Sequence, residues 1–329
     1  MTSIKDVATH AGVAISTVSK VLNHYPNVSE DTKEKVNRAI EELHFVPNSI
    51  ASALSSKQSG RVALLINLNT QTQAIDEIDM QYLHGAISKS QELKMDVVTV
   101  FFSMLQNKKL EEVITYFKAQ NISGIVIVGL SKEEQVLHEL IATNQFKVVL
   151  VDAPIINRTT SCVWVDQKKA QKDVARKTIL ENPVKKVLYL AGKSNGYVTE
   201  RRLQAMKELA RELKVELIVK IGNFSELEAR KLTLQLGEEV DCVVCASDLM
   251  AIGAMRALMD MDIFRPVCGF DGITLMGYAG KQMNTVAQNF YEIGAAAILE
   301  LEKLMNGQQG QEVILPHKVV QMQYLDIIR

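Results

Sequence analysis

Residues 4–23 read IKDVATHAGVAISTVSKVLN, and this stretch decides how the N-terminal part of the chain folds. Apolar residues recur at the spacing of one helix face over residues 4–11 and again over residues 15–22. Gly12 stands between the two runs, where a tight turn is needed. Two short helices joined by a turn that contains glycine form a helix-turn-helix. The second helix presents Ser16, Thr17 and Lys20 outward, and such small hydroxyls and a cation suit a DNA major groove.

A third helix and a short connecting segment follow. Ser29 can cap the third helix, and the apolar stripe over residues 36–43 closes a three-helix core. Pro47 stops this helix, and residues 48–60 hold about two further helical turns and a serine-rich linker. An isolated helix this short is marginal in water. We therefore expect residues 48–60 to become helical only on DNA, with Leu54 as an apolar wedge in the minor groove.

The runs KDVATHAGVAISTVSKVLN, PNVSEDTKEKV and LHFVPNSIASALSSKQSG resemble the DNA-binding region of the LacI/GalR family of transcriptional regulators. The resemblance implies base contacts in the major groove, phosphate contacts, and minor-groove contacts from the connecting segment. The implied DNA-binding residues are Ile15, Ser16, Thr17, Ser19, Lys20, Asn23, Asn27, Ser29, Ala51, Leu54 and Lys57. Two departures leave the DNA sequence open. Ala14 replaces a usual serine, and Lys20 replaces a common arginine, so a bidentate contact to guanine becomes a single one.

The charge of the N-terminal part allows an alternative interpretation. Residues 1–60 contain six basic and six acidic side chains, whereas DNA-binding domains are usually basic. A protein-interaction bundle would also fit three small amphipathic helices. The acidic side chains cluster on the third helix, however, away from the outward face of the second, so we favour the DNA-binding interpretation.

The composition of the whole chain limits its class. At 329 residues with 47% hydrophobic residues, the chain is long enough for several domains with sizeable cores. The net charge is −1, no apolar stretch is long enough to span a bilayer, and no signal peptide is apparent. Four cysteines indicate a reducing compartment, so we expect a cytoplasmic protein. Cys242 and Cys245 lie three apart in an apolar strand and would point to opposite faces, so we expect no metal site.

From residue 61 onward, short apolar runs alternate with amphipathic stretches. Nearly continuous apolar strands indicate a parallel sheet covered on both faces. The expected strands lie in residues 62–68, 96–102, 124–130, 147–153, 186–192, 216–222, 241–247 and 266–272, with a further element at CVWVD. The alternation predicts an α/β fold, two doubly wound subdomains like those of periplasmic binding proteins. The expected domains are residues 1–47 (DNA-binding), 48–60 (hinge helix and linker) and 61–329 (effector-binding and dimerisation), the last divided into about 61–160 with 289–315 and about 161–288 with 316–329.

Polar and aromatic residues follow several of the expected strands. Ligands of open α/β sheets bind at the carboxyl ends of the strands. The candidates are Asp152, Trp164, Arg202, Phe224, Ser247 and Asp271. Carboxylates and arginine suit sugar hydroxyls, and flat rings suit the C–H face of a sugar. Taken singly, each residue could instead be a cap, a core side chain or a surface side chain.

The family resemblance extends over this second part, in ISGIVIVG, VVLVDAP, CVVCASDLMAIGAMRALMD and FDG. It implies effector contacts at those six residues and at Gln288, and an interdomain role for Asp166. The stretches YVTERRLQAM and GFDGITLMGYAGKQMNTVAQNFYEIG are faintly similar to the trehalose-repressor branch, which takes a phosphorylated disaccharide. The sequence therefore leaves a sugar and a sugar phosphate both open.

The sequence thus predicts a transcriptional regulator, a repressor of carbohydrate-use genes. A homodimer would bind a near-palindromic operator in double-stranded DNA and would be released by a sugar or sugar phosphate. The alternative is a regulator that needs a corepressor, or a sugar sensor that acts through a phosphorylated carrier protein. No Walker loop, GxGxxG after a strand or HExxH is present. We therefore expect no enzyme, no cofactor, no catalytic residue and no membrane partner.

Overall fold

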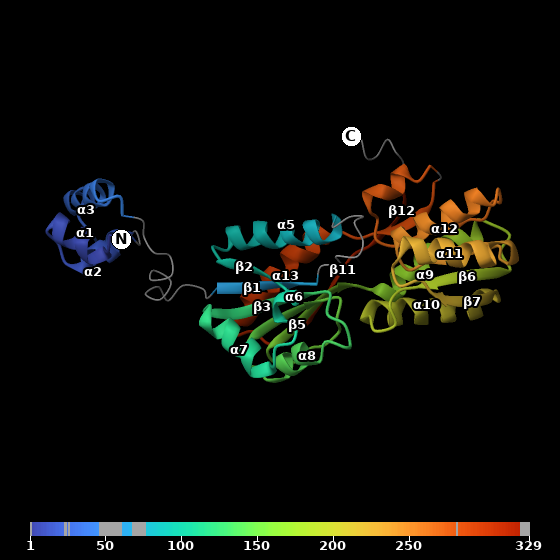
Figure 1. Ribbon diagram of the computed structural model, residues 1–329, viewed down its shortest axis with the longest axis horizontal. Helices are drawn as coiled ribbons and strands as arrows, with labels where there is room; N and C mark the ends of the chain where they lie inside the picture. The colour runs from blue at the N-terminus through green and yellow to red at the C-terminus, as the bar shows by residue number, and fades with distance from the viewer. Residues whose placement is uncertain are drawn as a thin grey trace. The chain divides into compact units, whose positions relative to one another are not determined.

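The computed structural model describes residues 2–22, 25, 27–45, 61–67, 77–280 and 282–322. The chain forms two compact units, Met1–Ser59 and Gly60–Arg329. The first unit is helical, whereas the second is built from sheets covered by helices (Figure 1). Within these described ranges, no helix has the length and apolar character that crossing a membrane requires.

The first unit contains the expected helix-turn-helix. Its described helices are α1 (Ile4–Ala11), α2 (Ile15–Leu22) and α3 (Glu30–Glu42). Ser3 and Asp6 form a capping box at the start of α1, which satisfies amide groups that the first turn leaves unpaired. Gly12 ends α1 with a φ of 66°, in the left-handed region that glycine adopts without steric cost. Ser29 caps α3 as expected.

The core of the first unit is a small valine cluster. Val7, Val18 and Val36 come from the three helices and are fully buried. Ile40 and Leu43 pack against them from α3. The apolar stripes seen in the sequence therefore meet, which leaves the outer face of α2 exposed.

The first sheet of the second unit has six parallel strands in the order β11-β5-β4-β3-β1-β2. The strands are β1 (Arg61–Ile66), β2 (Val97–Phe101), β3 (Ile122–Val128), β4 (Lys147–Val151), β5 (Thr160–Val165) and β11 (Glu312–Leu315). The helices that accompany it are α5 (Glu77–Glu92), α6 (Phe102–Leu105), α7 (Leu110–Ala119), α8 (Gln135–Ala142) and α13 (Phe290–Met305). We call this sheet with these helices the first subdomain.

Helices on both faces explain why the strands are apolar throughout. On β1, Leu64 and Ile66 join the cluster that includes residues of α5 and α13. Ala63 and Leu65 point to the opposite face and join the cluster that includes residues of α7 and α8. Both faces are therefore buried, as the sequence predicted.

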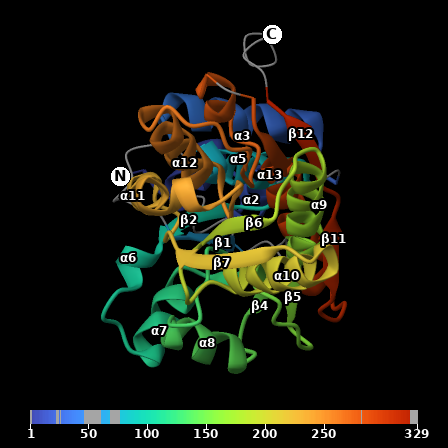
Figure 2. The same ribbon diagram turned by 90° about the vertical axis from the view of Figure 1, so that its right-hand side faces the viewer.

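The second sheet also has six strands, in the order β12-β10-β9-β8-β6-β7. The strands are β6 (Lys186–Ala191), β7 (Glu216–Ile221), β8 (Cys242–Cys245), β9 (Val267–Cys268), β10 (Asn284–Ala287) and β12 (Lys318–Gln321). The helices are α9 (Gln167–Leu180), α10 (Tyr197–Leu213), α11 (Glu226–Leu236), α12 (Asp248–Asp260) and the short η1 (Gly237–Glu239) and η2 (Thr274–Tyr278). Figure 2 shows α9 beside α10 and α11 beside α12, on opposite sides of this sheet. This sheet with these helices is the second subdomain.

Three short strands were missing from the prediction. β10, β11 and β12 have four residues each, too few to show a reliable pattern. β12 runs antiparallel to β10, so the expectation of purely parallel sheets is wrong at this edge. An antiparallel edge strand on an otherwise parallel sheet is common in α/β folds.

The chain passes between the two subdomains three times. The first passage follows Val165, because β5 pairs with β4 and β11 in the first sheet. The expected boundary near residue 160 is therefore wrong by one strand. The loop before residue 160 only connects two strands of the same sheet, β4 and β5. The other passages follow Ala287 and Leu315.

Helices α5 and α13 approach each other closely through two glycines. A Cβ added at Gly85 would lie 1.9 Å from the carbonyl oxygen of Tyr291, and one added at Gly294 would lie 2.3 Å from that of Tyr82. A side chain at either position would therefore meet rigid backbone. This crossing fixes the position of Tyr82, which points into the site described below.

We expect Gly294→Ala to destabilise the second unit by about 1–3 kcal/mol, although alanine is the better helix former. Chemical denaturation of the purified protein measures this. Gln204→Ala, on the exposed side of α10, is the control and should change the free energy of unfolding by less than about 0.5 kcal/mol. An unchanged free energy of unfolding for Gly294→Ala would contradict this expectation and would mean that helices α5 and α13 can move apart at little cost.

Candidate functional site

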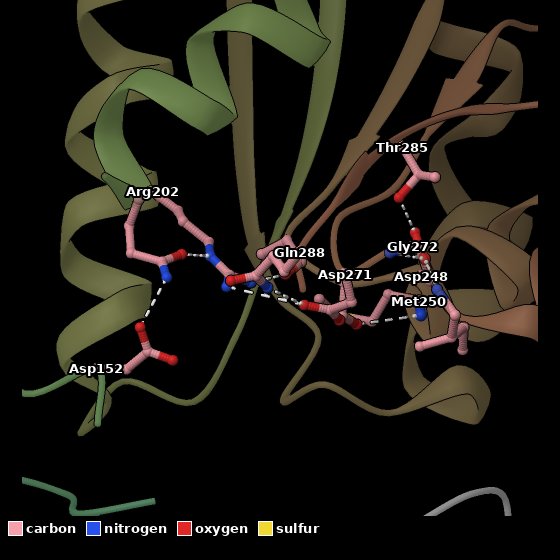
Figure 3. Close-up of polar contacts among 12 residues, drawn as sticks. Asp152, Arg202, Asp248, Met250, Asp271, Gly272, Thr285 and Gln288 are labelled. Carbon is pink, nitrogen blue, oxygen red and sulfur yellow. Dashed lines mark hydrogen bonds and ion pairs between the residues drawn. The ribbon is translucent and has the colours of Figure 1, made fainter. Parts of the chain in front are cut away.

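Arg202 on α10 is the centre of a buried polar chain (Figure 3). Its side chain is only 5% exposed. Nε donates to Gln167 Oε1 at 2.9 Å, and Nη1 donates to the carbonyl oxygen of Ala246 at the end of β8. The guanidinium lies over the ring of Phe270, 3.6 Å from its centroid. A buried cation needs such acceptors, because an unpaired charge would be costly.

Asp152 connects this chain to the first subdomain. It follows β4 in a left-handed conformation, with φ 61°. Its Oδ1 accepts from Gln167 Nε2 at 2.9 Å, and its Oδ2 accepts from the Tyr82 hydroxyl at 3.4 Å. Burial raises the pKa of Tyr82 well above its usual value, so the hydroxyl remains a donor. The path Tyr82–Asp152–Gln167–Arg202 therefore joins both subdomains.

Asp271 and Gln288 continue the chain within the second subdomain. Asp271 Oδ1 lies 3.8 Å from Arg202 Nη2 and accepts from Gln288 Nε2 at 3.2 Å. Gln288 Oε1 is buried and has no hydrogen-bond partner among the described residues. A buried acceptor without a partner is unusual. It is therefore available to a donor supplied by a ligand.

Asp248 supports this part of the site from beneath. It is fully buried and accepts hydrogen bonds from Gly272 N at 2.7 Å, Ile273 N at 2.9 Å and Thr285 Oγ1 at 2.6 Å. These bonds hold the loop that carries Asp271 against β10. Asp248 thus positions the loop, while Asp271 points toward Arg202.

One buried carboxyl group, Asp248, and two partly buried ones, Asp152 and Asp271, lie around the guanidinium of Arg202. Burial raises the pKa of Asp271 to about 8 and that of Asp248 to about 6, and it also raises the pKa of Asp152. The hydrogen bonds to Asp248 stabilise its charged form. Asp248 and Asp271 titrate as a pair, and we therefore assign the negative charge of the pair to Asp248 and its proton to Asp271.

The predicted aromatic residues lie beside the polar chain and not within it. Trp164 on β5 is 6% exposed, and the guanidinium of Arg201 lies 5.0 Å from its ring centroid. The ring of Phe224 packs over Gly192, where an added Cβ would lie 2.0 Å from the ring. Gly192 follows β6, so both rings lie where strands end.

The sixth candidate, Ser247, has a local role. Its hydroxyl accepts from Met250 N at 3.3 Å and caps α12. Asp166, expected between the subdomains, similarly caps α9 by accepting from Lys169 N at 3.0 Å. A cap uses one lone pair of the side-chain oxygen, so these residues can still meet a ligand.

Two further sets of contacts join the subdomains at the rim. On α5, Glu77 accepts from both the amide and the hydroxyl of Thr274 in the second subdomain. Across another part of the rim, Lys132 pairs with Glu200 at 2.7 Å. The two subdomains are thus joined at the edge of their interface as well as at its centre.

A separate cavity of about 620 Å³ opens beside the end of β2 and the start of α8. Its lining includes Asn67, Phe101, Gln106, Glu133 and Leu137. None of the predicted site residues lines it.

The described part of the site offers little for catalysis. All four cysteines are buried, and burial raises the pKa of Cys162 and Cys268 to about 12, so the reactive thiolate is disfavoured. The described residues contain no group of three metal-binding side chains. The arrangement of donors, acceptors and rings suits reversible binding of a polyhydroxylated molecule.

In the first unit, the candidate DNA-binding residues on α2 lie at its surface. Ile15 is 47% exposed, an unusual position for a large apolar side chain, and Ser16 and Lys20 are exposed beside it. Asn27 is exposed, and Ser29 is exposed and caps α3. Asn23, Ala51, Leu54 and Lys57 lie outside the described residues.

Comparison with known proteins decides the family. Residues 3–48 match the bacterial regulatory proteins of the lacI family, and residues 71–309 match the periplasmic binding protein domain. The HTH-type transcriptional regulator RegA of Clostridium saccharobutylicum is 30% identical over 97% of this chain and 98% of RegA. The chain belongs to the LacI family.

Two further similarities agree with this assignment. The ribose operon repressor of Halalkalibacterium halodurans is 28% identical to this LacI-family chain, over 92% of it and 91% of the repressor. The crystal structure of the lac repressor dimer bound to operator and the anti-inducer ONPF has the same fold, with a TM-score of 0.82, 23% identity and 98% coverage of both chains. The chain is therefore a transcriptional regulator of the LacI family and not an enzyme.

The structure brings together only some of the predicted effector residues. Asp152, Arg202, Asp271 and Gln288 share one polar chain. The residue that links them, Gln167, was missed. It follows Asp166 at the start of a helix, and nothing in its local sequence distinguishes it from any surface glutamine.

We expect the stability of the second unit to fall as pH rises from about 4 to about 8. The pKa of Asp271 is raised from 3.8 to about 8, so between these values the folded protein holds a proton that the unfolded chain has lost. This stabilisation is complete below the unfolded pKa and disappears as pH passes the folded one, with a slope of at most about 1.4 kcal/mol per pH unit. Asp271→Asn should flatten this slope in denaturation curves recorded at pH 5 and pH 8. The exposed Asp260→Asn is the control, and equal slopes in all three proteins would contradict the assignment.

Proposed function

We propose that this chain is a cytoplasmic transcriptional repressor of carbohydrate-use genes that a small polyhydroxylated effector controls. Residues 1–47 bind DNA, and residues 61–329 bind the effector and dimerise. Residues 48–60 are the hinge helix and linker between these two parts. The observation that carries the proposal is the buried chain Asp152–Gln167–Arg202–Asp271, which lies where strands of both sheets end. Ligands of α/β folds bind at such ends.

The charges in the cleft favour a neutral sugar over a sugar phosphate. Arg202 already has acceptors in Gln167 and Ala246, and the carboxyl groups of Asp152 and Asp271 lie on either side of it. A phosphate placed here would have to displace these acceptors from Arg202 and would meet the carboxylate of Asp152. Hydroxyl groups, in contrast, can both donate to carboxylates and accept from a guanidinium.

The exposed side of α2 is the proposed reading surface for DNA. Ile15 and Ser16 would contact base edges, and Lys20 would approach a guanine. Thr17, Ser19, Asn23, Asn27 and Ser29 would contact phosphates, while Ala51, Leu54 and Lys57 would act at the minor groove. These assignments rest on the family pattern at the matching positions and on the exposure of the α2 side chains.

The chain is proposed to act as a homodimer, one protomer on each half of a near-palindromic operator. Exposed apolar side chains support a second copy as the partner. Met80 and Ile87 on α5, and Met259 and Phe264 at the end of α12 and beyond it, are 41–66% exposed. The lac repressor with the same fold is described as a dimer bound to operator.

The effector and the operator would be coupled through the subdomains. An effector that favours one relative position of the two subdomains changes how the paired protomers present their DNA-binding units. Such coupling is typically about 1–3 kcal/mol, and it is reciprocal, so operator must change effector affinity by the same factor.

We expect the purified protein to select a near-palindromic sequence from a random DNA pool. Lys20→Ala should then weaken binding to that sequence by about 1–3 kcal/mol, measured by fluorescence anisotropy at stated salt. Lys35→Ala is the matched control, because Lys35 is exposed on α3 and pairs with Asp31. Equal losses for both variants would contradict a reading role for α2, and no selection without a second protein would favour the corepressor alternative.

We expect one class of neutral mono- or disaccharide to raise the melting temperature of the wild-type protein, since a ligand of the folded state stabilises it. Asp152→Asn should remove this shift, because it takes away the carboxylate that accepts from the sugar hydroxyls. Phosphorylated forms of the same sugars form the second arm of the screen. A shift with sugar phosphates alone would refute the neutral-effector proposal, and a full shift with Asp152→Asn would refute the site.

A further inference from the structure

Gln167 occupies a unique place in the backbone. It is the first residue of α9, directly after the first passage between the subdomains, and its side chain is fully buried. Asp166 caps the helix immediately before it. The backbone of Gln167 is therefore fixed to the second subdomain, while its side chain reaches Asp152 of the first.

The orientation of the Gln167 amide is dictated by its partners. A carboxylate only accepts hydrogen bonds and a guanidinium only donates them. The amide nitrogen must therefore face Asp152, at 2.9 Å, and the amide oxygen must face Arg202, at 2.9 Å. Hydrogen bonds to charged groups are stronger than neutral ones. No other orientation of the amide satisfies both neighbours.

The contact between Gln167 and Asp152 differs from those at the rim. Lys132 and Glu200 are 39% and 66% exposed at their side chains, and such surface pairs contribute little. The amide of Gln167 is shielded from water, so breaking its bonds leaves Asp152 and Arg202 each with one hydrogen bond fewer and no water to replace it. The central contact is thus more shielded from water than the Lys132–Glu200 pair, and it links a charged group of each subdomain through one amide.

We propose that Gln167 is the positioning residue that keeps the two subdomains together in the absence of effector and sets the spacing between Asp152 and Arg202. The claim that this spacing serves effector binding rests on the function proposed above. The claim that Gln167 holds the two subdomains together does not depend on that function, so it can be tested without DNA and without a sugar.

The test measures the distance between the subdomains in the full-length protein by double electron–electron resonance spectroscopy. Spin labels are attached to Ala142→Cys on α8 and Lys207→Cys on α10, both exposed positions. The four native cysteines are fully buried, so the labels react at the introduced ones. Wild-type background should give one narrow distance distribution.

Gln167→Met keeps the volume of the side chain but removes both hydrogen bonds. We expect the ratio of closed to open molecules to fall roughly fivefold, the effect of losing about 1 kcal/mol, so that a longer distance appears beside the wild-type one. Gln171→Met is the matched control. Gln171 lies one turn along the same helix and is equally buried, and its side-chain amide has no hydrogen-bond partner among the described residues. This control should keep the narrow distribution.

A second variant separates positioning from folding. Gln167→Glu keeps the acceptor for Arg202 but places a second carboxylate against Asp152. Relative to the wild-type protein at the same pH, whose Asp271 also titrates in this range, it should separate the subdomains at pH 8 and let them come together again at pH 5. If Gln167→Met fails to fold, Gln167→Asn, whose shorter amide cannot reach both partners, takes its place. Wild-type distances in the Gln167 variants would overturn the proposal, whatever the outcome of the sugar screen.

Discussion

The burial of one guanidinium among three carboxyl groups is the constraint on which the site depends. Arg202 could not remain buried without acceptors, because removing a charge from water is costly unless hydrogen bonds replace the water. Its acceptors come from α9, the end of β8 and the loop after β9. These elements are distant in sequence, and the cation therefore fixes several strand ends relative to one another.

The same constraint explains why both subdomains take part. Asp152 belongs to the first subdomain, whereas Arg202 and Asp271 belong to the second. Within the part of the chain that the structure describes, the amide of Gln167 is the side-chain group that bonds to both the acid and the cation. An amide can face a carboxylate and a guanidinium at once, which no charged side chain can do. A ligand with several hydroxyl groups has this same dual character, so it fits between these groups without adding charge.

More of the fold than of the candidate site could be predicted from the local sequence. The apolar runs predicted eight strands because helices cover both faces of each sheet, and Leu64 and Leu65 on β1 point to opposite clusters. The boundary near residue 160 and the antiparallel edge strand depend on which strands pair with each other. A strand of four residues has too short a pattern to predict its partner. Asp152 and Arg202 were predicted because they follow expected strands, where ligands of open α/β sheets bind, and because the family resemblance implies contacts there. Gln167, in contrast, gains its role only from neighbours that the fold brings to it.

The order of the segments along the chain has a consequence for how the protein is made. The first sheet is completed by β11, which pairs with β5 although almost 150 residues separate them in sequence, as Cys162 pairs with Glu312. Helix α13, which packs against α5 through Gly294, is also late in the chain. During synthesis at the ribosome, the first subdomain must therefore wait, with apolar surface uncovered, until the second has largely emerged. Folding of the first subdomain is in this way tied to the appearance of residues 290–315, after most of the second subdomain has been made.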